Sequence, residues 1–453
     1  MFSNRNIKKK IIFFLIFLLL NNCSFDNKTG IWSGGEKEER RISELEKEQK
    51  QIINVEKIYS SESIYIKDKL LTKNIILSKT KNNSVWSMSS LNHQNFLGNI
   101  HLPRISNIFL KKKIGKDKFS MRKAMSPLLA FDNDIIFSDD NGTIFNIDKG
   151  GRINWKKNIY KNIYKKINKN LVFSIYKNNV YIADNVGFIY AIDLTNGKLV
   201  WIKNYGASIK SNIKIFHDQI FLIDHNNKIF CLNVKDGSLI WNIHSISSFI
   251  KSRNLLSLAV SKQGDLFAIT SSADIFKIRG NTGNIIWSRN TAESLYADAT
   301  DFFNSSEIVL TDDQIFFSSG FTFYSYDVDT GNINWKNEVH SVATPIIDGK
   351  NIFIVTQNGY FVILNKDTGR IISSTNILNI LKKKKQKTHV TGFIMGSGKI
   401  YSVTLNGYLI VSSAISGKTE YFKKIGASNI SPLIINNGAL YILTKNSRII
   451  GFN

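Results

Sequence analysis

A glycine followed four residues later by tryptophan recurs along this 453-residue chain. One copy reads Asp-Val-Asp-Thr-Gly-Asn-Ile-Asn-Trp at residues 327–335, and five of the seven tryptophans occupy this last position. Successive glycines stand 38 to 48 residues apart, which is the spacing of an array of one supersecondary unit. The complete copies are Gly151/Trp155, Gly197/Trp201, Gly237/Trp241, Gly283/Trp287 and Gly331/Trp335; two degraded copies are Gly369 with Ser373 and Gly417 with Tyr421.

Two short apolar runs joined by a turn precede most of these copies. Residues 351–355 and 360–364 flank Asn358-Gly359, a pair that favours a tight β-hairpin because both residues tolerate positive φ. The tryptophan strand follows the hairpin, and one more apolar strand, such as residues 341–347, precedes it. Four strands repeated about every 45 residues are typical of a propeller blade. The sequence therefore predicts an all-β propeller of four-stranded antiparallel blades.

The number of blades depends on how the two ends of the chain meet. The sequence ends on a hairpin, residues 439–443 and 448–452, with no tryptophan strand after it. Trp86, in a short run at residues 84–88, is a tryptophan outside the repeats. We expect the Trp86 strand to pair with the C-terminal hairpin, because this pairing removes an exposed edge and closes the ring. The count is then eight blades over residues 81–453, with seven as the alternative.

The beginning of the chain has the features of an export signal. Basic residues precede an unbroken apolar run at residues 11–20, and ten helical residues extend only about 15 Å, half of a bilayer core. We therefore predict a signal peptide over residues 1–22. Cys23 follows and resembles a lipobox cysteine, although Asn21 and Asn22 stand where small residues are usual. We expect Cys23 to carry the lipid anchor, palmitate included; cleavage without lipidation is the alternative.

Residues 23–80 are expected to form a polar and charged tether between this anchor and the propeller. Ile42, Leu45, Ile52 and Val55 have roughly the spacing of one helical face. A short amphipathic helix and a solvated spacer are the two interpretations of this stretch. Cys23 and Cys231 are the only cysteines, so we expect no internal disulfide framework.

The formal charge of +25 raises the question of an anionic partner. Lysine, asparagine and isoleucine are abundant throughout, so the charge follows from overall composition and does not predict nucleic-acid binding. A membrane face or an acidic protein would suit such a surface. The lysine run at residues 382–385, with Lys387, is interpreted either as a solvated loop or as a contact for such a partner.

The sequence contains no recognisable set of catalytic residues. The seven histidines are scattered without metal-ligand spacing, and no nucleophile elbow or Walker-type phosphate loop is present. Asp193, Asp327 and Asp367 are interpreted as turn residues, because they stand at what look like equivalent blade positions. We therefore predict no enzyme activity, no cofactor and no bound metal.

The tryptophan phrase resembles the repeat of quinoprotein (PQQ-type) propellers, a superfamily that includes both enzymes and scaffolds. Its enzymes use calcium ligands, a catalytic aspartate and often two adjacent cysteines, and this chain has no adjacent cysteines. Together with the lipobox, the tether and eight blades, this makes residues 86–453 resemble the BamB family of outer-membrane lipoproteins. Residues 86–93 and 101–103 look like the alphaproteobacterial form of the family.

The resemblance implies a scaffold of the β-barrel assembly machinery, lipid-anchored at the periplasmic face of the outer membrane. Expected partners are the POTRA domains of a BamA homologue, other assembly subunits, and nascent outer-membrane proteins, which could pair with blade edges by β-augmentation. In the family, two neighbouring inter-blade loops make the contacts. The corresponding residues here are Phe249, Ile250, Lys251 and Arg253 in one loop, and Asp298 and Asp301 in the other.

Two other functions remain open at this point. A periplasmic PQQ-dependent dehydrogenase-like quinoprotein is the main alternative, and it predicts quinone absorbance and calcium-dependent dye reduction. A cell-envelope propeller that binds carbohydrate or another lipoprotein is the third, and affinity purification from membranes would separate it from a barrel-assembly scaffold.

Overall fold

The chain divides into two units, Met1–Ile64 and Tyr65–Asn453. The computed structural model describes residues 74–116, 128–164, 166–245, 252, 254–291, 304–341, 343–385, 388–426, 432–444 and 446–453, and nine isolated residues before position 74 (24, 25, 32, 33, 40, 43, 44, 47 and 69). In the first unit, β1 (Ser24–Phe25) pairs antiparallel with β2 (Trp32–Ser33). Cys23 and the apolar residues of the predicted tether helix lie outside the described residues, although Arg40, Ser43, Glu44 and Lys47 are helical. No helix in this described set is long and apolar enough to cross a membrane.

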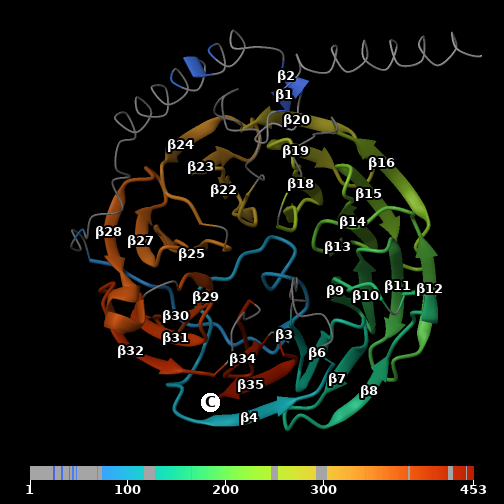
Figure 1. The fold of residues 1–453 in the computed structure, drawn as a ribbon, viewed down its shortest axis with the longest axis horizontal. Coiled ribbons are helices and arrows are strands. Elements are labelled where there is room, and N and C mark those ends of the chain that lie inside the picture. Colours follow the sequence, from blue (N-terminus) through green and yellow to red (C-terminus); the bar gives the residue numbers. More distant parts are fainter. Residues whose placement is uncertain are drawn as a thin grey trace, which may run out of the picture. The chain divides into compact units, whose positions relative to one another are not determined.

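The second unit is a ring of eight antiparallel sheets, which confirms the prediction of an eight-bladed β-propeller (Figure 1). Blade 1 contains β5 (Leu129–Phe131), β6 (Asp134–Ser138), β7 (Ile144–Ile147) and β8 (Ile153–Lys157), and blade 2 contains β9 (Leu171–Tyr176), β10 (Asn179–Asp184), β11 (Phe188–Asp193) and β12 (Leu199–Asn204). Blade 3 contains β13 (Lys214–Phe216), β14 (Gln219–Ile223), β15 (Lys228–Asn233) and β16 (Leu239–His244), and blade 4 contains β17 (Leu258–Val260), β18 (Asp265–Ile269), β19 (Asp274–Arg279) and β20 (Ile285–Asn290).

Blades 5 to 8 repeat this order from the axis outward. They contain β21 (Val309–Leu310), β22 (Gln314–Ser319), β23 (Thr322–Asp327) and β24 (Ile333–Asn337); β25 (Ile346–Asp348), β26 (Asn351–Val355), β27 (Tyr360–Asn365) and β28 (Ile371–Asn376); β29 (Val390–Gly396), β30 (Lys399–Thr404), β31 (Tyr408–Ser413) and β32 (Thr419–Lys424); and β33 (Ile434–Asn436), β34 (Ala439–Leu443), β35 (Arg448–Phe452) and β4 (Ile108–Lys113). Two 3-10 helices, η3 (Asn162–Tyr164) and η4 (Ile377–Lys385), lie between blades 1 and 2 and between blades 6 and 7.

The core of the ring lies between neighbouring blades. The two middle strands of each blade are almost entirely buried, because each sheet packs another sheet on both of its faces. Tyr181 and Ile189 of blade 2, for example, belong to one buried cluster with Ile220 and Leu222 of blade 3. The outer strands are mostly exposed, as in the pattern of β12, where only Trp201 is partly buried.

Each tryptophan of the repeat fastens its blade to the next one. The indole lies over the motif glycine of the following blade, where a Cβ would come within 2.3 to 2.8 Å of the ring. Every such glycine has φ between +66° and +78°, a backbone conformation that favours glycine. The indole Nε1 also donates a hydrogen bond to a backbone carbonyl of that blade, namely Trp155 to Leu194, Trp201 to Val234, Trp241 to Gly280, Trp287 to Val328 and Trp335 to Lys366, at 2.8 to 3.2 Å.

The expectation that the Trp86 strand closes the ring is wrong. The strand that pairs with the C-terminal β35 is β4, so an N-terminal strand does close the ring, but it begins 22 residues after Trp86 (Figure 1). Leu110 stands opposite Gly451 just as Trp201 stands opposite Ala191, and it packs over Gly151 of blade 1. A leucine is large enough to cover that glycine, so the closing strand carries no tryptophan signal. Trp86 itself lies in β3 (Val85–Trp86), which pairs with β5 inside blade 1.

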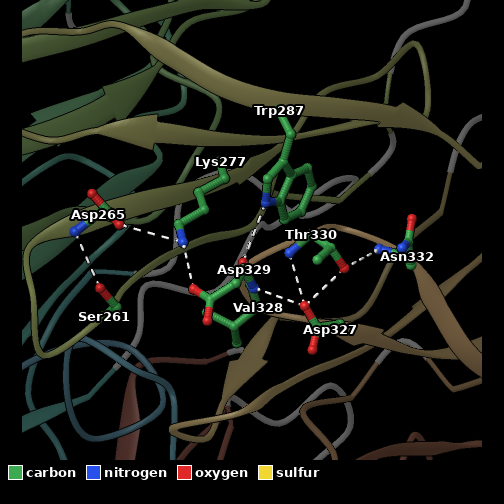
Figure 2. Close-up of polar contacts among 9 residues, drawn as sticks. All are labelled: Ser261, Asp265, Lys277, Trp287, Asp327, Val328, Asp329, Thr330 and Asn332. Atoms are coloured by element: carbon green, nitrogen blue, oxygen red, sulfur yellow. Dashed lines mark hydrogen bonds and ion pairs between the residues drawn. The ribbon is translucent and has the colours of Figure 1, made fainter.

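The aspartate of the repeat builds the turn between the third and fourth strands (Figure 2). Asp327 Oδ1 accepts hydrogen bonds from the backbone N–H of Asp329 (3.0 Å) and Thr330 (2.8 Å) and from the Thr330 hydroxyl (2.8 Å). The bonds from Thr330 are the main cause that lowers the pKa of Asp327. The prediction that Asp367 holds the equivalent position in blade 6 is wrong. Asn365 accepts the corresponding hydrogen bonds there.

Substituting alanine for Gly369 should destabilise the ring more than the same change at Gly206. Both residues have positive φ (+67° and +72°), so each substitution costs about 1–2 kcal/mol of backbone strain. An added Cβ at Gly369 would lie 2.3 Å from the Trp335 indole, whereas one at Gly206 meets nothing within 4 Å. We expect Gly369→Ala to lose a further 1–3 kcal/mol, roughly, from overpacking. Denaturant midpoints check this, and equal midpoints for the two variants would contradict it.

Candidate functional site

The axis of the ring is filled by residues 83–100 of the chain itself, which we call the axial plug (Figure 1). The plug forms hydrogen bonds with the innermost strands or strand ends of all eight blades. Its backbone carbonyls accept bonds from Asp132, Ile175, Val260, Leu310, Ser397 and Asn437 at 2.7 to 3.0 Å, in blades 1, 2, 4, 5, 7 and 8. Side-chain bonds from Lys214 and Thr344 add blades 3 and 6.

The plug enters from the face where the innermost strands end and turns back at Ser89-Ser90. The Leu91 N–H donates to the Met88 carbonyl (3.1 Å), and both Ser90 and Leu91 have positive φ, at 54° and 79°. Such values are strained for residues other than glycine and persist only where the surroundings hold them. The tip of the plug is therefore a strained turn that its contacts with the ring keep in place, and it reaches the opposite face of the ring.

Lys214 holds the plug from blade 3. Its side chain is fully buried, and its Nζ donates to the Ser89 carbonyl (2.7 Å), to the Asn92 carbonyl (3.0 Å) and to Asn95 Oδ1. Burial lowers the pKa of Lys214 to about 8, and the nearby charge of Glu307 partly opposes this shift. A buried ammonium group is costly unless its hydrogen bonds are satisfied, so Lys214 favours the one backbone path of the plug that places these carbonyls around it. Sequence reasoning missed Lys214, because one lysine carries no signal in a lysine-rich chain.

A pocket of about 220 Å³, which we call the axial pocket, lies between the plug tip and the beginnings of the innermost strands. Trp86, Leu97 and Leu433 form part of its apolar lining. Glu307 supplies its charge: Oε1 accepts from the Ser89 hydroxyl (3.0 Å) and from Asn212 Nδ2 (2.6 Å). Its Oε2 is buried without a hydrogen-bond partner among the described residues.

The six sequence-predicted contact residues, Phe249, Ile250, Lys251, Arg253, Asp298 and Asp301, all lie outside the described residues. The described ends of their two loops do come together. Asn254 Nδ2 donates to Asn304 Oδ1 at 3.3 Å, joining the end of the first loop to the end of the second. Asn254 and Leu255 from one loop, and Ser305 and Glu307 from the other, line the axial pocket. Both loops therefore emerge beside it.

Other sites of possible chemistry are sparse in the described part of the chain. No group of three or more His, Cys, Asp or Glu side chains there could hold a metal ion. Cys231 is buried and free, and burial raises the pKa of its thiol to about 12, so the thiol stays protonated at neutral pH. Asp193 and Asp327 are turn residues, with carboxylates that bond to the threonine hydroxyls of their own turns.

The plug should make stability depend on pH through His93. Its Nδ1 lies 3.0 Å from the Val260 carbonyl, and its ring packs edge-on against Phe216 at 4.9 Å. Burial, followed by Lys214 and His217, lowers the pKa of His93 from 6.5 to about 4. The unfolded chain then binds more protons between these values, so stability is complete above pH 6.5 and falls as the pH drops towards 4.

We expect this loss to be about 2 kcal/mol, less than the whole shift implies because the imidazole is partly exposed. The variant His93→Gln keeps a donor for the Val260 carbonyl and should lose less stability between pH 6.5 and 4. Denaturant unfolding at several pH values measures the difference. An unchanged pH dependence in the variant would show that His93 is not the titrating group.

Comparison with solved structures finds many propellers of the same fold. The structure of BamB from Moraxella catarrhalis has a TM-score of 0.64 and 14% identity, covering 77% of this chain and 100% of that one. A europium-containing methanol dehydrogenase has the same TM-score at 11% identity, covering 80% of this chain and 90% of that one. Quinohemoprotein alcohol dehydrogenase from Comamonas testosteroni has a TM-score of 0.61 at 11% identity, with 81% and 80% covered. At these identities the likeness is one of fold.

Sequence comparison shows which family within this fold the chain matches. No curated protein matches the chain. Residues 140–375, just over half of the chain, match the family model described as outer membrane protein assembly factor BamB. This match includes six of the seven glycine-containing repeats and the strands between them. The chain therefore belongs to the BamB family of quinoprotein-like β-propellers.

Proposed function

We propose that this protein is a non-enzymatic scaffold lipoprotein of the β-barrel assembly machinery. In this proposal Cys23 carries the lipid anchor, the protein is held at the periplasmic face of the outer membrane, and the ring binds the POTRA domains of a BamA homologue. Other assembly subunits and nascent barrel proteins would meet it there. Membership of the BamB family supports the setting, and the axial plug supports the absence of catalysis.

The axial plug is the observation that carries the proposal. Small molecules bind in concave sites that bury most of their surface, and the axis is the main hollow of a propeller. Here the chain's own residues bond to every blade along that axis. The pockets beside the plug include the axial pocket of about 220 Å³, which the described ends of two loops help to line, and one of about 390 Å³ lined in part by Val85, Met88 and His93. This arrangement favours recognition of a protein over the enclosure of a substrate.

The two loops beside the axial pocket are the proposed partner surface. Phe249 and Ile250 would supply apolar anchors, and Lys251 and Arg253 would surround them with positive charge. Asp298 and Asp301 would place negative charge on the neighbouring loop. Two loops of opposite charge can fix the orientation in which one partner docks, because a partner docked the other way round would place like charges against each other. The Asn254–Asn304 hydrogen bond holds the ends of the loops together.

A PQQ-dependent dehydrogenase-like quinoprotein is the alternative function, because dehydrogenases share this fold at comparable TM-scores. The two functions differ in a simple measurement. Purified protein supplied with PQQ and Ca²⁺ should show no bound quinone absorbance and no calcium-dependent dye reduction. A stoichiometric quinone spectrum with dye reduction would replace the scaffold proposal by the enzymatic one.

We expect crosslinking in intact cells, followed by detergent purification of the tagged protein, to recover the BamA homologue. Reversing the charges of Lys251, Arg253, Asp298 and Asp301 together should reduce this recovery by at least about tenfold, since loss of one interfacial charge pair costs about 1.4 kcal/mol or more. Mass spectrometry of the crosslinked species gives the measurement.

A matched control reverses four exposed charges elsewhere on the ring, Lys198, Lys203, Asp312 and Asp367. This control should recover the partner at the wild-type level. Recovery that survives the loop variant would reject these four charges as the contact and leave the scaffold function in place. Complete absence of barrel-assembly subunits from the wild-type sample would overturn the function itself.

A further inference from the structure

The outer edge of blade 6 is paired with a residue from far upstream in the chain. Lys69 and Ser374 of β28 form an antiparallel bridge in which each donates its N–H to the carbonyl of the other, at 2.9 and 3.0 Å. Two further bonds support it, from Lys69 Nζ to the Ile371 carbonyl (2.8 Å) and from the Ser373 hydroxyl to the Lys69 carbonyl (3.3 Å). Lys69 thus occupies the position of a fifth strand on this sheet.

This pairing changes the exposure of the blade edge. Ser374 is fully buried, and so is Ser373 at 2% exposure. The residues at the equivalent position of six other outer strands, Ile202 and Asn242 among them, are exposed, and Phe422 of blade 7 is half-buried. Their strands β12 and β16 lie at the edges of their sheets. Blade 6 therefore differs from the other blades at the one place where Lys69 docks.

The composition of β28 explains why this edge accepts a strand. Exposed sheet edges are usually protected by charged side chains, lysine above all. The outer strands β4, β8, β12, β20, β24 and β32 each carry at least one lysine, arginine or glutamate. β16 carries none but keeps Trp241, and β28, which reads Ile-Ile-Ser-Ser-Thr-Asn, carries none either. It also has Ser373 where five other blades have tryptophan, and that hydroxyl bonds to Lys69. The outer strand of blade 6 is thus an uncharged sheet edge, and the Ser373 hydroxyl adds a hydrogen-bond donor to it.

We propose that the outer edge of blade 6 is a strand-acceptor site for the chain's own tether, held through the backbone of Lys69. The next described residue that is buried in the ring is Ile75, which lies in the core of blades 6 and 7. Docking therefore removes six residues, about 20 Å of extended chain, from the free length of the tether. It also moves the point of attachment to the outer rim of blade 6.

The consequence for the membrane rests on the proposed function. If Cys23 is the anchor, 46 residues separate it from Lys69. A flexible chain of this length has an end-to-end distance of about 35–40 Å. A tether fixed at the rim restrains the ring to a volume centred on blade 6. The site is one of main-chain recognition, so it needs an extended backbone more than a particular side chain.

Residue-resolved hydrogen exchange of the full-length protein tests the proposal. In the wild type, the Ser374 amide should exchange at least about tenfold more slowly than the Asn242 amide, which holds the equivalent position of blade 3 without a neighbouring strand. Lys69→Pro removes the donor to the Ser374 carbonyl and lies outside the ring, so the blades should fold normally. The Lys69 carbonyl that accepts from Ser374 remains in this variant, but loss of the other bond of the bridge weakens docking, so the exchange of Ser374 should rise towards the level of Asn242.

The matched variant Lys69→Met keeps the backbone donor and removes only the Nζ contact, so it should retain most of the protection. Equal exchange of Ser374 and Asn242 in the wild type would overturn the proposal. Protection that survives Lys69→Pro would also overturn it. Equal loss in the Met and Pro variants would reject main-chain recognition in favour of the lysine side chain.

The outcome is separable from that of the proposed function. Recovery of the BamA homologue without protection of Ser374 would reject the tether site and keep the scaffold. Protection of Ser374 without any barrel-assembly partner would keep the tether site and reject the scaffold.

Discussion

The indole of one blade resting on the glycine of the next is the contact on which the ring depends. A single blade leaves both faces of its sheet exposed, so it is stable only between two others. At five junctions a tryptophan covers a glycine that has no room for a Cβ, and its Nε1–H bonds to a carbonyl of that neighbour. At the closing junction Leu110 covers Gly151 in the same way. Blade 6, which has Ser373 in place of the tryptophan, is the one whose outer strand pairs with Lys69.

A closed ring of this kind leaves its axis to be filled, and here the chain fills it with its own residues. The plug is held through its backbone carbonyls, by one buried cation and by side chains of its own such as Asn95, whose Nδ2 donates to the Leu258 and Ile308 carbonyls. Its strained tip is held against Glu307 and Thr344 on the face that bears the axial pocket.

The repeat made the architecture readable from the sequence, because glycine and tryptophan each have a local physical reason for their position. Trp86 was misplaced because a tryptophan signals a flat apolar contact without saying which sheet provides it, and Leu110 was missed because leucine fits many positions. The bridge at Lys69 and the role of Lys214 could not be predicted, since both depend on residues more than 100 positions away. The six predicted loop residues lie outside the described residues and remain predictions.

The central claim is that the face bearing the axial pocket is where the protein meets its partner. Photocrosslinking in intact cells from single positions tests it most directly, with the reactive group at Leu255 on the lip of the pocket or at Lys336 on the exposed outer strand of blade 5. The account predicts an adduct with a large barrel-assembly subunit from position 255 and none from position 336. An adduct from position 336 alone would contradict it.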